Sequence, residues 1–238
     1  MAGLTSLGHD WDSIRAGVLE GRSGIQRVAD WAKYDGLNTN LGGPIDDFEV
    51  PEHYTRKRIR SMGRVSLFST TTSERALEQA GLLGEDVVSN GDTGIAYGSS
   101  SGTPEAIGEF GAMLFEHSTR TITATSYIRM MSHTAAVNTG VFFGIRGRLI
   151  STCTACTSGS QAIGYAYEAI KQGKQKIMVA GGAEELSPTQ AAVFDILFAT
   201  SVRNDEPELT PRPFDKDRDG LVIGEGAATF VLEDLEHA

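Results

Sequence analysis

Residues 149–172 read LISTCTACTSGSQAIGYAYEAIKQ, and this stretch carries the strongest structural signal in the chain. Its first part, together with the arginine that precedes the stretch, is the short apolar run Arg148–Cys153, which predicts a buried strand. Its last part, Thr157–Gln172, has the length and composition of a helix. The small residues between the two predict a tight turn that presents Cys156. Strand, turn and helix in this order are typical of α/β folds.

The same alternation continues on both sides of this stretch, where the 28 glycines of the chain cluster at the ends of apolar runs. We therefore expect an α/β fold with a largely buried sheet. The expected strands are Thr93–Gly98, Arg148–Cys153, Lys176–Ala180 and Ala227–Glu233. The expected helices are Trp11–Glu20, Arg56–Ala80, Pro104–His117, Tyr127–Phe143, Thr157–Gln172 and Pro188–Ala199. Expected loops are Leu37–Pro51 and Asn204–Pro213.

Composition excludes several classes of protein. The formal net charge of -10 over 238 residues disfavours nucleic acid as a general partner, because phosphate binding needs an electropositive face. No apolar run is long enough to cross a bilayer, and the N-terminus lacks a secretory signal pattern. We therefore expect a globular protein of the cytoplasm with no membrane partner.

The residue types around Cys156 indicate a chemical role for its thiol. A thiol at the start of a helix faces unpaired backbone N–H groups and the positive end of the helix dipole, which favour the nucleophilic thiolate. Strand, turn and helix also match the nucleophile elbow, in which nearby backbone N–H groups help to hold an oxyanion. On these residues alone, a buried structural cysteine remains an equal alternative.

Two metal or redox readings have weaker support. Cys153 and Cys156 form a C-x-x-C pair, but the first cysteine lies in the expected strand, unlike redox sites in which both belong to the helix. Two cysteines are also too few for a structural zinc site. The segment Asp215–Gly220 opens like a calcium loop, yet position 226, where a glutamate is required, is a glycine. We expect no bound metal.

Taken together, the motifs resemble one family. Thr154–Gly159 is similar to the active-site segment of β-ketoacyl-acyl-carrier-protein synthases I and II. Further segments resemble this family in the same order along the chain. They are Gly3–Gly8, Arg56–Lys57 with Arg60 and Met62, Gly144–Gly147, Ala180–Glu185, Asp215–Gly220 and Gly224–Gly226.

The resemblance implies a thiolase-like fold, a layered α-β-α arrangement in which two similar halves pack together, usually within a homodimer. Residues 1–238 resemble the N-terminal half. In this family the cysteine, here Cys156, accepts an acyl group from acyl carrier protein. Malonyl carrier protein is then decarboxylated and the resulting carbanion attacks the thioester, a step of fatty acid biosynthesis. This chemistry requires no organic cofactor and no metal.

The resemblance also implies that part of the catalytic machinery lies elsewhere. The family's two catalytic histidines belong to the C-terminal half, and the five histidines here lie outside those motifs. We read them as structural or solvent-facing, although His133 precedes the strand of the elbow and is a minor candidate base. The chain also resembles one that starts after the family's first apolar strand. We therefore expect no condensing activity from this chain alone.

The resemblance places carrier-protein docking on the first basic helix, at Arg56, Lys57 and Arg60, with Arg203 as a second position. Acyl carrier proteins are acidic, so such a cluster would speed encounter. A solvated basic face is the alternative. The rival function is a noncatalytic carrier-protein-binding partner of a synthase, although retention of Cys156 disfavours it. Ser99–Gly102 is either a phosphate cradle or, as we prefer, an ordinary loop.

Overall fold

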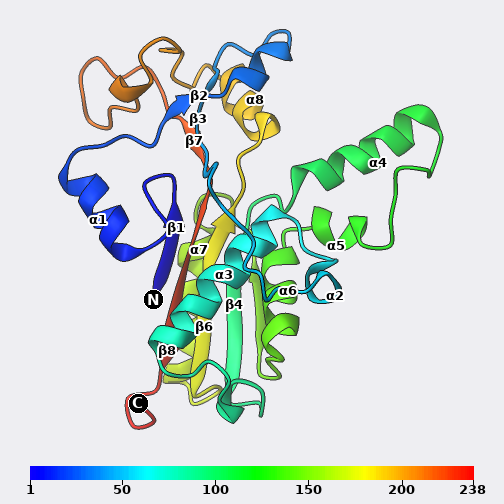
Figure 1. Ribbon diagram of the computed structural model, residues 1–238, viewed down its shortest axis with the longest axis vertical. Coiled ribbons are helices and arrows are strands. Elements are labelled where there is room, and N and C mark those ends of the chain that lie inside the picture. The colour runs from blue at the N-terminus through cyan, green and yellow to red at the C-terminus, as the bar shows by residue number, and fades with distance from the viewer. The chain divides into compact units, whose positions relative to one another are not determined.

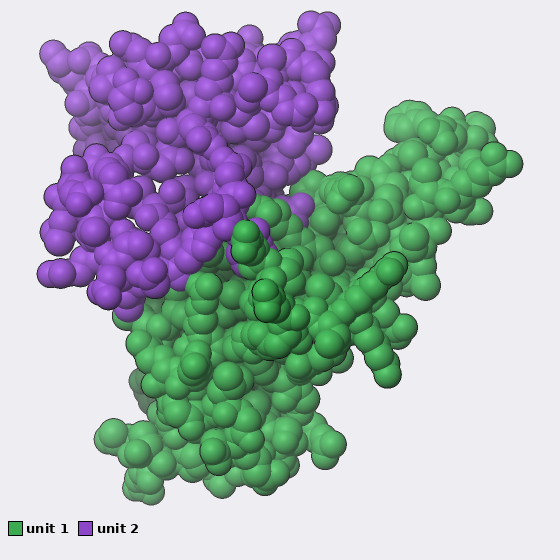
Figure 2. Space-filling model, viewed as in Figure 1, with its two compact units in different colours: residues 1–4, 49–184, 227–238 green, residues 5–48, 185–226 purple.

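The computed structural model describes residues 1–238, which form two compact units (Figure 2). Unit 1 contains Met1–Leu4, Glu49–Glu184 and Ala227–Ala238. Unit 2 contains Thr5–Phe48 and Glu185–Gly226. Each unit is therefore built from segments that lie far apart in the sequence.

A five-stranded sheet forms the centre of unit 1, with the strand order β1-β8-β6-β4-β5. Its strands are β1 (Ala2–Thr5), β8 (Gly226–Glu233), β6 (Ile177–Glu184), β4 (Thr93–Gly98) and β5 (Leu149–Thr152). The central strand β4 is buried along its whole length and pairs in parallel with both β5 and β6. Parallel strands buried on both faces read as continuous apolar runs, which fits β4 and β6. The expectation that Arg148–Cys153 is a buried strand is wrong in part, because β5 lies at the edge of the sheet and only its Thr152 is buried.

Helices cover both faces of this sheet (Figure 1). On one face, α7 (Ser158–Lys171) packs its alanines against small side chains of β4 and β6. Adjacent strand residues point to opposite faces. Ala96 of β4 faces α7, so Tyr97 points to the opposite face of the sheet. There the hydroxyl of Tyr97 meets Thr72 of α3 (Arg64–Gln79). The expected α-β-α layering is confirmed.

Hydroxyl groups join the two helices of this second face. Ser66 of α3 lies 2.9 Å from Thr134 of α6 (Thr134–Phe143), and Ser69 lies 2.9 Å from Thr139. All four side chains are buried. Buried hydroxyls are costly unless they are hydrogen-bonded, so these pairs fix how α3 lies against α6.

Two expected helices are each divided in two. Arg56–Ala80 is not continuous: α2 spans Arg56–Ile59, and α3 starts at Arg64. Gly63 lies between them, and a Cβ at this position would come within 2.1 Å of the Thr103 hydroxyl. The close approach of that neighbouring loop therefore breaks a run of good helix formers.

Tyr127–Phe143 is likewise split into α5 (Ser126–Met130) and α6, with a turn at residues 131–133. The other helices of unit 1 match their expected places within about two residues, as is usual at helix ends. They are α4 (Pro104–Glu116) and α7. The short 3-10 helix η2 (Asp86–Val88) was not expected.

Unit 2 contains a smaller sheet, with the order β2-β3-β7. Its helices and strands are α1 (Trp11–Leu19), β2 (Gln26–Arg27), η1 (Ala29–Lys33), β3 (Leu41–Gly43), α8 (Pro188–Ile196), η3 (Pro207–Leu209) and β7 (Ile223–Gly224). The expectation of a plain loop at Leu37–Pro51 is wrong, because β3 lies inside it. Strands of two or three residues are too short to show an alternating pattern, so the sequence did not reveal them.

Carboxylates hold the two segments of unit 2 together. Glu225 accepts hydrogen bonds from the amides of Ile45, at 2.7 Å, and Leu186, at 3.1 Å. Asp195 of α8 accepts from both amide groups of Asn38, each at 2.9 Å. The bonds from Ile45 and Asn38 join segments that are more than a hundred residues apart in the chain. Measured against the thickness of a bilayer, every helix of the chain is too short or too polar to span it.

Candidate active site

Cys156 lies in the turn between β5 and α7. The strand ends at Thr152 and the helix begins at Ser158, one residue later than expected. Cys156 is therefore two residues before the helix and is exposed. Its side chain makes no hydrogen bond, which leaves the thiol open to a reagent.

The backbone of this turn has an unusual conformation at the residue before the cysteine. Ala155 has a φ of 52°, in the left-handed region that non-glycine residues seldom occupy. Such residues persist only where the surroundings hold them, and they cluster at functional sites. A strained residue directly before an exposed thiol, in a turn from strand to helix, resembles the arrangement of a nucleophile elbow.

Hydrogen bonds of the Ser158 side chain stabilise the turn. Its buried hydroxyl accepts from the Thr154 amide at 2.9 Å and donates to the Ala155 carbonyl at 2.6 Å. The Thr152 hydroxyl donates to the Ser158 carbonyl at 2.8 Å. The end of the strand and the start of the helix are therefore linked on both sides of Cys156.

Packing of α7 on the sheet depends on glycines at the ends of the strands. A Cβ on Gly98 would come within 2.4 Å of the Ser158 carbonyl carbon, and a Cβ on Gly182 within 2.9 Å of the Gly159 Cα. Both contacts are shorter than a real Cβ contact. Only glycine at these positions lets the first turn of α7 lie so close to β4 and β6.

The second cysteine of the C-x-x-C pair has a different environment. Cys153 directs its sulfur toward the Ser100 carbonyl, at 3.4 Å, and the Ser132 hydroxyl, at 3.3 Å. The expectation that Cys153 belongs to the strand and Cys156 to the helix is wrong by one and two residues, because both lie in the turn between Thr152 and Ser158. Both are free thiols. This placement differs from a redox pair within one helical turn.

The loop Ser99–Gly102 already holds an anion from its own chain. The carboxylate of Glu184 accepts from the Ser100 amide at 2.6 Å, the Ser99 hydroxyl at 3.2 Å and the Ser101 hydroxyl at 3.3 Å. The interpretation of this segment as a structural loop is therefore preferable to a phosphate cradle. Glu184 was part of a quoted motif, but its partners come from another strand end and the sequence did not reveal them.

Three of the four predicted docking residues are exposed cations. Arg56 and Lys57 belong to α2, and Arg60 caps its C-terminal end. None of the three forms an ion pair with an acidic side chain, whereas their neighbour Arg58 stacks on Phe142 at 3.7 Å. These three cations therefore remain available to a partner.

The fourth predicted docking residue is held within unit 2. The Arg203 guanidinium lies 3.4 Å from the Asp219 carboxylate and donates to the Asp217 carbonyl at 3.1 Å. Asp219 also accepts from the Ser201 hydroxyl at 2.9 Å. The loop that resembles a calcium site thus uses its carboxylates to bind its own backbone and Arg203.

Most of the histidines have acidic partners away from the elbow. His9 pairs with Asp47 at 2.9 Å and His53 with Glu74 at 2.8 Å. His133 caps the N-terminal end of α6, and no hydrogen bond joins its ring to Cys156. No hydrogen bond joins any of these imidazoles to the thiol.

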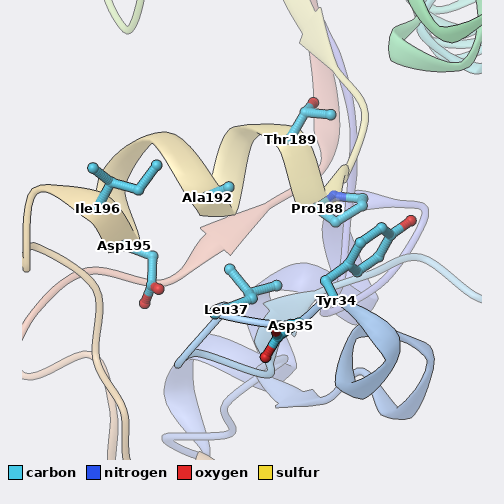
Figure 3. Close-up of a pocket in the computed structure, with 9 residues that line it drawn as sticks. Tyr34, Asp35, Leu37, Pro188, Thr189, Ala192, Asp195 and Ile196 are labelled. Carbon is cyan, nitrogen blue, oxygen red and sulfur yellow. The ribbon is translucent and has the colours of Figure 1, made fainter.

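One cavity of about 300 Å³ lies within unit 2, between α8 and residues 34–37 (Figure 3). Apolar atoms dominate its lining, which includes Leu37, Ala192 and Ile196. Asp195 also lines it, but that carboxylate is fully engaged by Asn38, Thr39 and Thr200. Cys156 does not line this cavity, so the cavity is not part of the elbow.

Comparisons with known proteins agree with this geometry. The family model described as the N-terminal domain of β-ketoacyl synthases matches residues 1–238. The chain is 35% identical over 242 residues to 3-oxoacyl-[acyl-carrier-protein] synthase 2 of Vibrio harveyi, with coverage of 100% of this chain and 57% of the relative. It is 33% identical over 237 residues to 3-oxoacyl-[acyl-carrier-protein] synthase 1 of Haemophilus influenzae, covering 99% of this chain and 58% of the relative.

A solved β-ketoacyl synthase from Burkholderia phymatum STM815 is 54% identical and superposes with a TM-score of 0.97, covering 100% of this chain and 58% of that one. The chain thus spans less than two thirds of the length of these relatives. Its mixed α/β architecture is the thiolase-like fold of those neighbours. Because the family model covers every residue, the chain belongs to the β-ketoacyl synthase N-terminal domain family.

Proposed function

We propose that this chain supplies the acyl-accepting cysteine of a β-ketoacyl-acyl-carrier-protein synthase, with Cys156 as the nucleophile. The observation that carries the proposal is the exposed thiol directly after a left-handed alanine, in a turn between a buried sheet and a helix. Relatives named 3-oxoacyl-[acyl-carrier-protein] synthases support the choice of reaction.

In the proposed first step, the Cys156 thiolate attacks the thioester carbonyl of an acylated carrier protein. A new carbon–sulfur bond forms at Cys156, the bond to the carrier breaks, and the carrier thiolate leaves and takes up a proton. In the second step, malonyl carrier protein loses carbon dioxide and its carbanion attacks the Cys156 thioester, releasing the thiolate. Covalent catalysis divides one difficult condensation into two easier steps.

Acyl carrier protein, in its acyl and malonyl forms, is the proposed partner. The exposed cations Arg56, Lys57 and Arg60 support docking of an acidic protein, since none of them has an acidic partner within the chain. Arg203 is a weaker docking candidate because Asp219 and the Asp217 carbonyl already bind it.

We further propose a homodimer of the full-length enzyme. Strand β5 is at the edge of the five-stranded sheet and pairs only with β4. Its Leu149 is 48% exposed, and Val141 on the adjacent helix α6 is 77% exposed. Open strand edges with exposed apolar side chains favour pairing with another chain. The two free cysteines are consistent with the reducing cytoplasm as the proposed compartment.

The test of the nucleophile is covalent labelling. The purified chain is incubated with cerulenin, an acyl mimic that reacts with thiols, and the adduct is located by peptide mass spectrometry, with Cys156→Ala as the control. Selective modification of Cys156 is the expected result. Equal modification of Cys153 and Cys156, or none in a folded sample, would show that the chain has no functional nucleophile site.

Condensation tests the division of the catalytic groups. With acyl and malonyl carrier proteins, the 238-residue chain is expected to form no condensed product, because no hydrogen bond joins any of its histidine side chains to Cys156. Rapid product formation by the chain alone would contradict this. Binding of carrier protein without acylation of Cys156 would instead support the rival function, a noncatalytic partner.

A further inference from the structure

The carboxylate of Glu184 is the centre of a hydrogen-bond network at the C-terminal ends of three parallel strands. Glu184 is the last residue of β6, and the loop that it binds follows β4. One oxygen accepts from the hydroxyls of Ser99 and Ser101, and the other accepts from the Ser100 amide at 2.6 Å. Hydrogen bonds to an ionised acceptor are about twice as strong as neutral ones, so the loop is firmly held.

The other side of the same loop faces the strand that carries the elbow. The Ser99 amide donates to the Thr152 carbonyl at 3.3 Å. The Ser100 carbonyl accepts from the Ser132 hydroxyl at 2.9 Å and from the Cys153 thiol at 3.4 Å. Ser100 thus links the two sides: its amide donates a hydrogen bond to Glu184, and its carbonyl accepts hydrogen bonds from Ser132 and Cys153.

We propose that Glu184 is a positioning residue for Cys156: it fixes the loop Ser99–Gly102, and this loop fixes Thr152 and Cys153 at the entrance of the nucleophile turn. The proposal rests on the proposed function of Cys156. Glu184 itself takes no part in bond making, since the three hydrogen bonds that its carboxylate accepts all come from the loop. Displacement of a reacting atom by about 1 Å can reduce a rate about a hundredfold, so a distant support of this kind affects reactivity.

Position and charge can be separated with two substitutions. In Glu184→Gln, the side-chain oxygen still accepts from the Ser100 amide, and the two serine hydroxyls can rotate to accept from the new NH2 group. The loop is then retained although the charge is lost. Glu184→Ala removes the charge and the loop bonds together. A positioning role therefore predicts that Gln resembles the native protein and Ala does not, whereas a purely electrostatic role predicts that both behave alike.

The first measurement is amide hydrogen exchange on the full chain, read on peptides that contain residues 99–102 and 153–158. Glu184→Ala is expected to raise exchange about tenfold or more in both segments, and Glu184→Gln to leave both nearly unchanged. Glu74→Ala is the matched control, because Glu74 also accepts two side-chain hydrogen bonds, from His53 and Tyr54, but has no link to the elbow. Faster exchange confined to residues 99–102 would overturn the proposal.

The second measurement is the rate of cerulenin labelling at Cys156. Glu184→Ala is expected to lower it about tenfold or more, and Glu184→Gln less than about threefold. Equal rates for Gln and Ala, or no change in either, would overturn the proposal. If the native chain is not labelled at Cys156, the proposed function fails, while the exchange experiment still decides whether Glu184 supports the turn. Should Glu184→Ala fail to fold, Ser132→Ala is the second variant. It removes the hydrogen bond that the Ser132 hydroxyl donates to the Ser100 carbonyl, and it is expected to raise amide hydrogen exchange in residues 153–158.

Discussion

The Ser158 hydroxyl accepts a hydrogen bond from the Thr154 amide at 2.9 Å, and this bond spans the turn that carries Cys156. The same hydroxyl donates to the Ala155 carbonyl at 2.6 Å, so one side chain supports the strained residue from inside the fold. The turn is therefore held by the first residue of the helix that follows it.

Ser158→Ala is expected to lower the free energy of unfolding by about 1–3 kcal/mol, because it leaves the Thr154 amide without its partner. It should also slow cerulenin labelling of Cys156, since Ala155 loses part of its support. Urea unfolding and peptide mass spectrometry measure the two effects. Ser160→Ala, at an exposed position of the same helix, is the control and should change neither. Unchanged stability in Ser158→Ala would contradict the assigned role.

Tyr97 offers a test of the buried hydroxyls between sheet and helices. Its hydroxyl lies 2.8 Å from that of Thr229, and burial raises its pKa to about 12. The ionised form is therefore disfavoured in the folded protein, and stability is expected to fall as pH rises from 10 toward 12. Tyr97→Phe should lose about 1 kcal/mol at pH 8 through the unpaired hydroxyls.

The difference in unfolding free energy between the native protein and Tyr97→Phe should then change by about 1 kcal/mol in favour of the variant between roughly pH 10 and 11. Urea titrations at several pH values measure this. Tyr127→Phe serves as the control, because Tyr127 is 57% exposed. A difference that stays constant with pH would show that Tyr97 ionises equally easily in the folded and unfolded states.

Asp195 is expected to stabilise unit 2 in a pH-dependent manner. Burial alone would raise its pKa, but hydrogen bonds from Asn38, Thr200 and Thr39 outweigh this and hold the pKa below its ordinary value of 3.8. The stabilisation is complete above that value and is lost as pH falls through the lower pKa of the folded state. Asp195→Asn should cost about 2 kcal/mol at pH 7 and less at about pH 3.

Chemical unfolding at the two pH values measures the effect of Asp195→Asn. Asp35→Asn is the matched control, since Asp35 lines the same cavity but is exposed. The assigned role of Asp195 would be wrong if the two variants were equally stable at pH 7.

Docking of carrier protein should depend on Lys57 and Arg60. Either Lys57→Glu or Arg60→Glu is expected to slow association about tenfold at low salt, with the difference disappearing as salt screens the charges. Stopped-flow binding at two ionic strengths measures this. Lys174→Glu makes the same change of charge at an exposed site in the turn that follows α7 and should have little effect. Equal slowing by all three variants would indicate a general charge effect.

Arg203→Ala is expected to behave differently from the α2 variants. Because Arg203 binds Asp219 and the Asp217 carbonyl, its removal should lower the stability of unit 2 rather than the salt-dependent association rate. Comparison of the unfolding midpoint with the association rate separates the two effects. A loss of association without a loss of stability would restore Arg203 as a docking residue.

The central strands and the cysteine turn were predictable from the sequence because their signals are local. Arg148–Cys153 is an apolar run, and small residues follow it directly. The break between α2 and α3 was not predictable, since the sequence around Gly63 does not indicate that Thr103 packs against it. Strand β3 was missed because three residues carry no periodicity.

The network around the elbow was predictable only in part. Ser99–Gly102 had the composition of an anion-binding turn, and it does bind an anion. The anion is the carboxylate of Glu184, which is the last residue of a different strand and meets the loop only because β4 and β6 are parallel neighbours. A sequence shows which groups can bind an anion, whereas the tertiary fold decides which anion reaches them.

During synthesis, β5 and Cys156 leave the ribosome before Glu184, because β6 follows β5 in the chain. A nascent chain that stops before residue 184 therefore carries the cysteine turn with an unsecured Ser99–Gly102 loop. Contacts between distant segments form later than local ones. Under the proposed role of Glu184, the thiol gains its full reactivity only after its own strand and the next one have left the exit tunnel.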